Sequence, residues 1–195
     1  MFDEDDDEKE KKEAPEPQSS PVANALFKSR TVLIFGEVDM KMAERVSAQL
    51  LAYAAEGDGD IRVIINSPGG HVESGDTIHD VIRFIRPEVI LIGTGWVASA
   101  GALIYCAAEK KNRLALPNTR FLLHQPLGGV RGQADDIEIE TAQILLMRDR
   151  LNRLFAGATG QPLAKIVADT ERNHWMTAGE AMAYGLVDRV VATAS

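Results

Sequence analysis

In the first two thirds of the chain, short apolar runs alternate with amphipathic stretches, and this alternation restricts the possible folds most. The runs TVLIF (31–35), IRVII (61–65) and VILI (89–92) have the length and branched side chains of buried strands. The stretches 40–56 and 74–85 repeat apolar residues every three or four positions, as one face of a helix does. The repeated order of strand and helix predicts an α/β fold with a mostly parallel, buried sheet.

The remaining elements continue the pattern. We expect helices at 98–108, 134–158, 163–170 and 178–184, and strands at 113–116, 120–123 and 186–191. In the long helix, apolar residues recur at seven-residue steps: Ile137, Ile144, Leu151 and Ala158. This spacing fits a core helix, and it fits equally a helix that packs between subunits.

Residues 1–22 differ in composition from the rest. They hold nine carboxylates, three lysines, and the prolines Pro15, Pro17 and Pro21, without apolar periodicity. A segment with so little apolar surface cannot offset its ordering entropy, so we predict a disordered acidic tail at 1–22 before one domain at 23–195. The tail is either a solvated end or a partner-binding or processed segment.

Charge and hydropathy exclude several functions. The tail carries most of the net charge of −8, and the near-neutral remainder offers no basic surface for nucleic acid or an anionic membrane. Residues 89–108 are uncharged, but their glycines favour a strand, a turn and a buried helix over a membrane span. A single cysteine, Cys106, excludes an intrachain disulfide and is expected to be a buried thiol. Without a signal-peptide pattern, we expect a cytoplasmic protein.

Polar and small residues follow three predicted strands. NSPGG (66–70) follows the second strand, GTGWVASAG (93–101) the third, and His124 ends the strand at 120–123. Functional groups of parallel sheets gather beyond the carboxyl ends of strands. Ser99 falls at a helix start, where free N–H groups favour developing negative charge. The sequence therefore indicates a serine nucleophile with a histidine base at one sheet edge.

Plainer interpretations exist for each residue. Ser99 alone fits a helix cap, SPGG alone fits a turn, and a histidine at a strand end is usually structural. The other histidines, His71, His79 and His174, suit the base less well by position.

Six ordered segments resemble the ATP-dependent Clp protease proteolytic subunit (ClpP) family: INSPGG, ASAGA, LPNTRFLLHQPLGG, GQADDIEIE, DTERN and AMAYGLVD. The resemblance spans about residues 31–191. It implies a ClpP/crotonase-like fold of repeated βαβ units, with the long helix as a protruding handle. It also implies a homo-oligomeric tetradecamer of two stacked seven-membered rings around a proteolytic chamber.

The same resemblance implies the site. Ser99 matches the nucleophile and His124 the base, and Gly70 and Ala100 match the oxyanion-hole donors. It implies no metal and no cofactor, and it implies an AAA+ unfoldase that feeds protein substrates to a serine endopeptidase.

Two features depart from the family pattern. Asn173 stands where the family has the third triad member, an aspartate; its amide oxygen can orient His124 but cannot supply a full negative charge. Asp169 is near in sequence as a possible substitute. Arg62 and Ile64 occupy two positions where aromatic docking residues are common, although Phe84 can still contribute to a docking groove.

Two alternatives to an active peptidase remain. The first is a weakly active or non-catalytic structural or regulatory ClpP-like ring subunit. The second is a crotonase-type acyl-CoA enzyme, which shares the fold but has no use for a Ser-His pair.

Overall fold

The computed structural model describes residues 20–193. Its elements in chain order are α1 (Pro21–Lys28), β1 (Thr31–Phe35), α2 (Met40–Glu56), β2 (Ile61–Ser67), α3 (Val72–Phe84), β3 (Val89–Ala98), α4 (Ala100–Tyr105), the 3₁₀ turn η1 (Lys110–Asn112), β4 (Arg113–Ala115), β5 (Arg120–Leu123), α5 (Ala134–Thr159), α6 (Leu163–Thr170), β6 (His174–Thr177), α7 (Ala178–Tyr184) and β7 (Arg189–Val190).

The sheet is mostly parallel, as expected. Its main path runs β1-β2-β3-β4-β7, and β5 pairs with β3 near the end of that strand. The β5–β6 pair is antiparallel, with Leu123 opposite His174. Because β3 is longer than its neighbours, it pairs with β4 first and with β5 further along. This arrangement carries three chain segments to one edge of the sheet.

One face of the sheet is covered more completely than the other. The side chains of β2 alternate between buried and more exposed positions, and the buried ones join a core with α2, α3 and α4. Helix α2 begins where the Asp39 carboxylate accepts a 2.7 Å hydrogen bond from the Met42 N–H. Burial of these apolar side chains is the main stabilising contribution to the layers.

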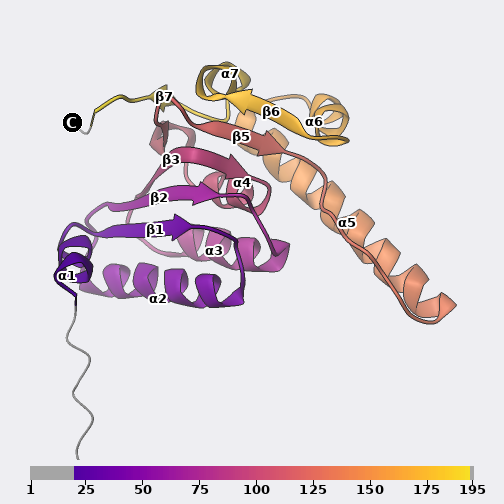
Figure 1. The fold of residues 1–195 in the computed structure, drawn as a ribbon, viewed down its shortest axis with the longest axis horizontal. Helices are drawn as coiled ribbons and strands as arrows, with labels where there is room; N and C mark the ends of the chain where they lie inside the picture. Colours follow the sequence, from indigo (N-terminus) through magenta and orange to yellow (C-terminus); the bar gives the residue numbers. More distant parts are fainter. Residues whose placement is uncertain (1–19, 194–195) are drawn as a thin grey trace, which may run out of the picture.

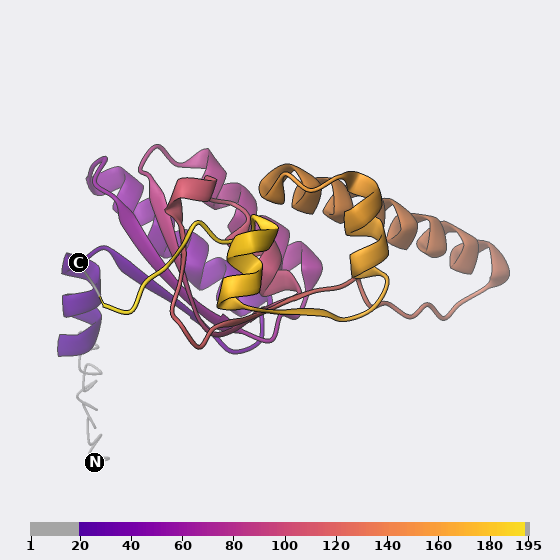
Figure 2. The same ribbon diagram turned by 90° about the horizontal axis from the view of Figure 1, so that it is seen from above.

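Helix α5 projects from the body (Figure 1). Its buried residues, Leu151, Asn152, Phe155 and Thr159, lie in its last third. Earlier apolar residues such as Ile139 and Leu146 are exposed. The core interpretation of the heptad spacing therefore holds for the end of the helix, where Leu151 is buried, and packing of the projecting part between subunits stays a prediction. Its tip lies at the opposite end of the molecule from α1 (Figure 2).

Several boundaries differ from the prediction. Helix α1 begins at Pro21, so the last two residues of the predicted tail, Pro21 and Val22, are helical. The rest of the predicted disordered tail, 1–19, lies outside the described residues. The strand at 89–92 continues to Ala98, and the expected helix at 98–108 shortens to α4. No helix among residues 20–193 is long and apolar enough to cross a membrane, and Cys106 is buried.

Candidate active site

Ser99 occupies a sharp turn between β3 and α4. Its backbone has φ 55° and ψ −120°, a positive φ that residues other than glycine rarely adopt. The Ser99 N–H donates a 3.0 Å hydrogen bond to the carbonyl of Leu122 in β5, and its carbonyl accepts from Leu103 in α4. These bonds fix the strained turn between two elements and leave the side chain half-buried at the sheet edge.

The glycine segment after β2 lies directly against this turn. A Cβ added to Gly69 would lie 2.5 Å from Ser99 Cβ and 3.1 Å from the Ala100 nitrogen. Gly69 also has a φ of +97°, which favours glycine. The segment is held from behind, because Val38 N–H donates to the Gly69 carbonyl and His71 N–H donates to the Val38 carbonyl, both at 2.8 Å.

Two backbone N–H groups remain free beside Ser99. Within residues 20–193, neither the Gly70 N–H nor the Ala100 N–H has a hydrogen-bond partner. Ala100 is the first residue of α4, where the N–H groups have no intrahelical acceptor. Donors of this kind can stabilise an oxyanion that forms at the serine.

His124 shares a small cavity with Ser99. The cavity has a volume of about 10 Å³, roughly that of one water probe. Besides Ser99, Ala100 and His124, its walls are Val72, Leu103, Pro126, Leu151 and Phe155. Both Ser99 and His124 are described, and no hydrogen bond joins them. Burial lowers the pKa of His124 below its ordinary value of 6.5, which favours the neutral imidazole that a general base requires.

Asn173 lies on the other side of His124. Leu123 and His174 are partners in the β5–β6 pair, so the next residues outward, His124 and Asn173, face each other beyond the ladder. Both line a second depression of about 350 Å³ with Gln125, Leu127, Glu171 and Arg172. The structure describes both side chains and records no hydrogen bond between them. Gln125 anchors this segment, since its N–H donates to the Thr170 carbonyl at 2.7 Å.

Asp169 does not take the place of the triad aspartate. Its Oδ2 accepts hydrogen bonds from Lys165 Nζ at 2.7 Å and from the Tyr184 hydroxyl at 2.6 Å. Burial raises the pKa of Asp169, whereas these two hydrogen bonds and the neighbouring charges lower it. The lowering effects together are larger, so the pKa of Asp169 is below its usual value. Asp169 thus belongs to a structural network with α7, away from the cavity of His124.

The apolar walls of the cavity were not identified from sequence. Leu151 and Phe155 come from α5, where the sequence marks them only as helical apolar residues, and Val72 comes from the first turn of α3, outside the helix predicted at 74–85. Arg150 fastens the two helices, because it donates hydrogen bonds of 2.7 and 2.6 Å to the two carboxylate oxygens of Asp76. Sequence spacing cannot show such a contact between helices that lie 74 positions apart.

The expected docking positions lie away from this cavity. Arg62 is exposed and Ile64 half-buried on the less covered face of the sheet. Phe84, at the end of α3, has 81% of its surface exposed. Among the described residues, no group of three or more His, Cys, Asp or Glu is placed to hold a metal ion.

The strained serine turn, the histidine beside it and the free N–H groups on a parallel α/β sheet are the features of a hydrolase site of the serine type. The family model of Clp protease matches residues 13–194. The chain belongs to the Clp protease family.

Individual relatives agree with this assignment. The chain is 58% identical over 186 residues to "ATP-dependent Clp protease proteolytic subunit 3" of Rhizobium meliloti, covering 95% of each chain. It is 58% identical over 165 residues to "ATP-dependent Clp protease proteolytic subunit 2" of Pseudomonas aeruginosa, covering 85% of this chain and 82% of that one.

Solved structures show the same fold. ClpP1 from Listeria monocytogenes matches with a TM-score of 0.80 and 50% identity, over 89% of this chain and 97% of that one. An asparagine-to-aspartate mutant of the same protein matches with a TM-score of 0.83 and 50% identity, over 88% and 96%. These matches confirm the predicted ClpP-like α/β fold.

Proposed function

We propose that this chain is the serine endopeptidase subunit of a Clp-type self-compartmentalising protease, with Ser99 as nucleophile and His124 as general base. The observation that carries the proposal is the strained Ser99 turn, which shares a cavity with His124 and adjoins two free N–H groups. Strain at a polar residue is retained where the surrounding structure imposes it, and such positions cluster at active sites.

The chemistry follows from these positions. Ser99 Oγ attacks the carbonyl carbon of a peptide bond while His124 accepts the hydroxyl proton. The carbonyl oxygen becomes an oxyanion, which the Gly70 and Ala100 N–H groups stabilise. His124 then donates its proton to the leaving amine, and a water molecule, deprotonated by His124, hydrolyses the acyl-enzyme. Neither a metal nor a cofactor takes part in these steps.

Asn173 has the role of an orienting residue. Its side-chain oxygen can accept the His124 Nδ1–H and hold the tautomer whose Nε2 faces Ser99. As a neutral amide it stabilises the imidazolium less than a carboxylate does. The proposed enzyme is therefore slow when it acts alone.

Assembly is part of the proposal. Clp protease family members form oligomeric rings that work with Clp ATPases, and we extend to this chain two stacked seven-membered rings, with the projecting part of α5 as handle. The AAA+ unfoldase would meet the surface of Arg62, Ile64 and Phe84, or a second ClpP-like subunit would supply that contact. Unfolded proteins and peptides are the substrates. The cytoplasmic location stays a prediction.

The test is hydrolysis of a fluorogenic peptide and of unfolded casein by the purified assembly. We expect wild-type turnover that Ser99→Ala abolishes while ring size, measured by sedimentation, is unchanged. Equal turnover in wild type and Ser99→Ala would contradict the proposal.

A non-catalytic ring subunit is the second candidate. It is favoured because Asn173 replaces the triad aspartate and no hydrogen bond joins the described side chains of Asn173 and His124. A mixed assembly with a second ClpP-like subunit separates the two candidates. If this chain is catalytic, Ser99→Ala in this chain alone lowers the turnover of the mixed complex. An unchanged turnover would assign it a structural role.

A further inference from the structure

A groove lined by cationic side chains lies between α3, η1 and α5. Its volume is about 540 Å³. Four of its lining residues are cationic, Arg83, Lys110, Arg113 and Arg153, and Glu109 is the one carboxylate among them. This groove shares no lining residue with the cavity of Ser99.

Arg113 gives the groove a buried positive charge. Only 1% of its surface is exposed, and within residues 20–193 it makes no ion pair. Its Nη2 donates to the Ala158 carbonyl at 2.6 Å, whereas Nε and Nη1 have no hydrogen-bond partner among the described residues. Burial raises the pKa of the neighbouring Cys106 thiol to about 11, so the thiol is neutral and does not compensate the charge. An uncompensated charge in a low-dielectric site raises the local positive potential.

The surface cations of the groove are held loosely. Lys110 and Arg83 are exposed, and Arg83 Nη1 donates to the Ala107 carbonyl at 3.3 Å rather than to a carboxylate. Arg153 pairs with Asp149 on its own helix, in an exposed ion pair of the kind that contributes little. These side chains can therefore turn towards another anion.

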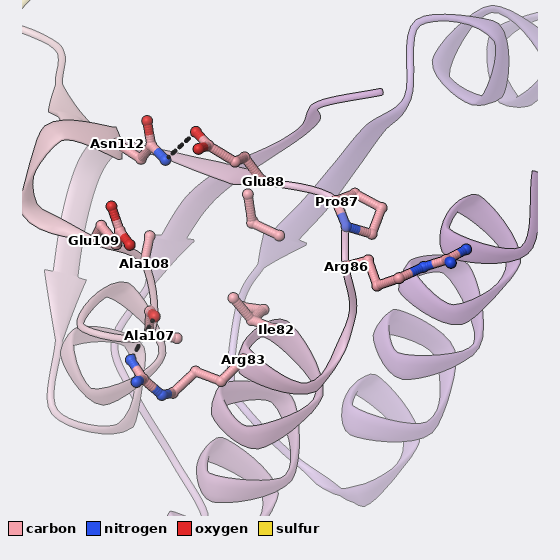
Figure 3. A pocket seen from close by; sticks show the side chains of 10 residues that line it. Ile82, Arg83, Arg86, Pro87, Glu88, Ala107, Ala108, Glu109 and Asn112 are labelled. Atoms are coloured by element: carbon pink, nitrogen blue, oxygen red, sulfur yellow. Dashed lines mark hydrogen bonds between the residues drawn. The ribbon is translucent and has the colours of Figure 1, made fainter. Parts of the chain in front are cut away.

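The groove continues towards the start of the chain. A second pocket of about 210 Å³ shares Arg83, Ala108 and Glu109 with it and adds Arg86 and Glu88. The Glu88 carboxylate already accepts hydrogen bonds from Lys111 and Asn112. Figure 3 shows Arg83 reaching Ala107 on one wall, and Arg86 pointing away on the other side. Arg86 lies 3.5 Å from the carboxylate of Asp58, in the loop before β2.

The described chain begins at the same edge of the sheet. Helix α1 precedes β1, the end of α3 precedes β3, and η1 precedes β4; because these strands are parallel, all three lie at the edge where strands begin (Figure 1). The eight residues of α1 span about 12 Å. The nineteen residues before Ser20 can reach about 60 Å when extended, several times the distance across four strands.

The composition of those nineteen residues complements the groove. Residues 3–16 hold the nine carboxylates, and the whole chain has a net charge of −8. The remainder of the chain is thus almost neutral, while its groove is cationic. We propose that the acidic N-terminal segment, residues 3–16, docks in the groove formed by Arg83, Lys110, Arg113 and Arg153, in the same copy or in a neighbouring one. The proposal does not depend on the peptidase activity.

Zero-length coupling with a water-soluble carbodiimide tests this in the full-length assembly. The reagent joins a carboxylate to an amine that it touches, and mass spectrometry of the digest identifies the pair. We expect tail carboxylates coupled to Lys110. Lys41 is the matched control, because it is exposed at the start of α2 on the opposite edge of the sheet. No coupling at Lys110, or equal coupling at Lys41, would overturn the proposal.

Charge variants check that the contact is electrostatic. Arg83→Gln with Arg153→Gln should lower the Lys110 yield about fivefold, the effect of losing two exposed charge pairs. Arg62→Gln, on the far face of the sheet, should leave the yield unchanged. About 1 M salt should suppress coupling, since the screening length falls to ~3 Å. A coupling yield at Lys110 that changes neither in the charge variants nor in high salt would contradict docking.

Mixing ¹⁵N-labelled and unlabelled copies shows whether the coupled tail and groove belong to one copy.

Discussion

His124 and Asn173 face each other one step beyond the β5–β6 ladder, whose last pair is Leu123 with His174, yet no hydrogen bond joins these two described side chains. The position opposite His124 thus carries a neutral amide in place of the carboxylate that a complete triad would have. Because burial lowers the pKa of His124, nothing in the site favours the imidazolium. The rate of the proposed reaction should therefore depend on what stands at 173.

The first prediction is that Asn173→Asp speeds peptide hydrolysis. A carboxylate beside His124 stabilises the imidazolium that forms in the transition state. We expect kcat to rise by at least about tenfold, a small part of the ~10⁴ that separates aspartate from asparagine in a chymotrypsin-type triad. Steady-state kinetics on a fluorogenic peptide, with Asn173→Ala as control, measures the effect. An intact assembly with unchanged or lower kcat would remove Asn173 from its orienting role.

The pH profile gives a second, independent prediction. In wild type the acid limb of kcat/KM should fall below pH 6.5, because the base works in its neutral form and the pKa of His124 is lowered. In Asn173→Asp the new negative charge raises the pKa of His124, so the limb should move to higher pH. Identical limbs in the two proteins would show that residue 173 does not act on His124.

Gly69 should be indispensable to the serine turn. In Gly69→Ala the added Cβ meets Ser99 Cβ at 2.5 Å, and the φ of +97° is strained for alanine. We expect loss of peptidase activity and a free energy of unfolding lower by ~1–3 kcal/mol. Gly157→Ala is the control, since a Cβ there meets nothing within 4 Å and the residue is helical. A fully active Gly69→Ala protein would contradict the described approach of the two segments.

The Arg150–Asp76 pair should support the wall of the active-site cavity. Asp76→Asn removes one partner of the 2.6 and 2.7 Å hydrogen bonds between α5 and α3, next to Leu151. The ion pair is partly exposed, so the cost in stability should be modest, ~0.5–1 kcal/mol. KM for peptide should rise several-fold while kcat changes less. Asp149→Asn, which breaks the exposed Arg153 pair, should leave KM unchanged, and an equal effect of both variants would argue against the assigned role.

Asp169 should act on stability and not on the reaction. Its carboxylate accepts hydrogen bonds from Lys165 and Tyr184, so Asp169→Asn should lower the free energy of unfolding by ~1–3 kcal/mol with turnover per folded subunit retained. The pKa of Asp169 is lower in the folded chain than in the unfolded chain, where it is about 3.9. The stabilisation is therefore fully present above pH ~3.9 and is lost as the pH falls through the pKa of the folded state. Denaturation at several pH values measures the difference. A loss of turnover in the folded variant would show that Asp169 contributes to the reaction and would contradict this prediction.

Much of the fold could be predicted from the sequence, because local signals and tertiary structure agree there. The helix at 40–56 and the strands at 31–35 and 120–123 have the predicted bounds. The extension of β3 to Ala98 could not be predicted, since glycines at 93 and 95 normally end a strand; here pairing with β5 continues it. Strand β6 was missed because four residues without alternation give no signal until β5 lies beside them.

The site was predictable in position and less so in detail. The carboxyl ends of parallel strands placed Ser99, His124 and the glycines together by topology alone. The positive φ of Ser99 and the anchoring of its N–H on Leu122 depend on two strands that meet only in the folded chain. The hydrogen bond from the Tyr184 hydroxyl to Asp169 also depends on the packing of α7, because Tyr184 follows Asp169 by fifteen residues.

The most direct test of the account is covalent labelling by a fluorophosphonate. Ser99 Oγ attacks phosphorus and displaces fluoride, which requires an activated hydroxyl but no bound peptide. We predict a phosphonylated Ser99 in the mass spectrum of the native assembly, with labelling lost in His124→Ala and faster in Asn173→Asp. An unlabelled Ser99 in the assembled protein, or labelling equal with and without His124, would contradict the central claim that these two residues form a nucleophile and its base.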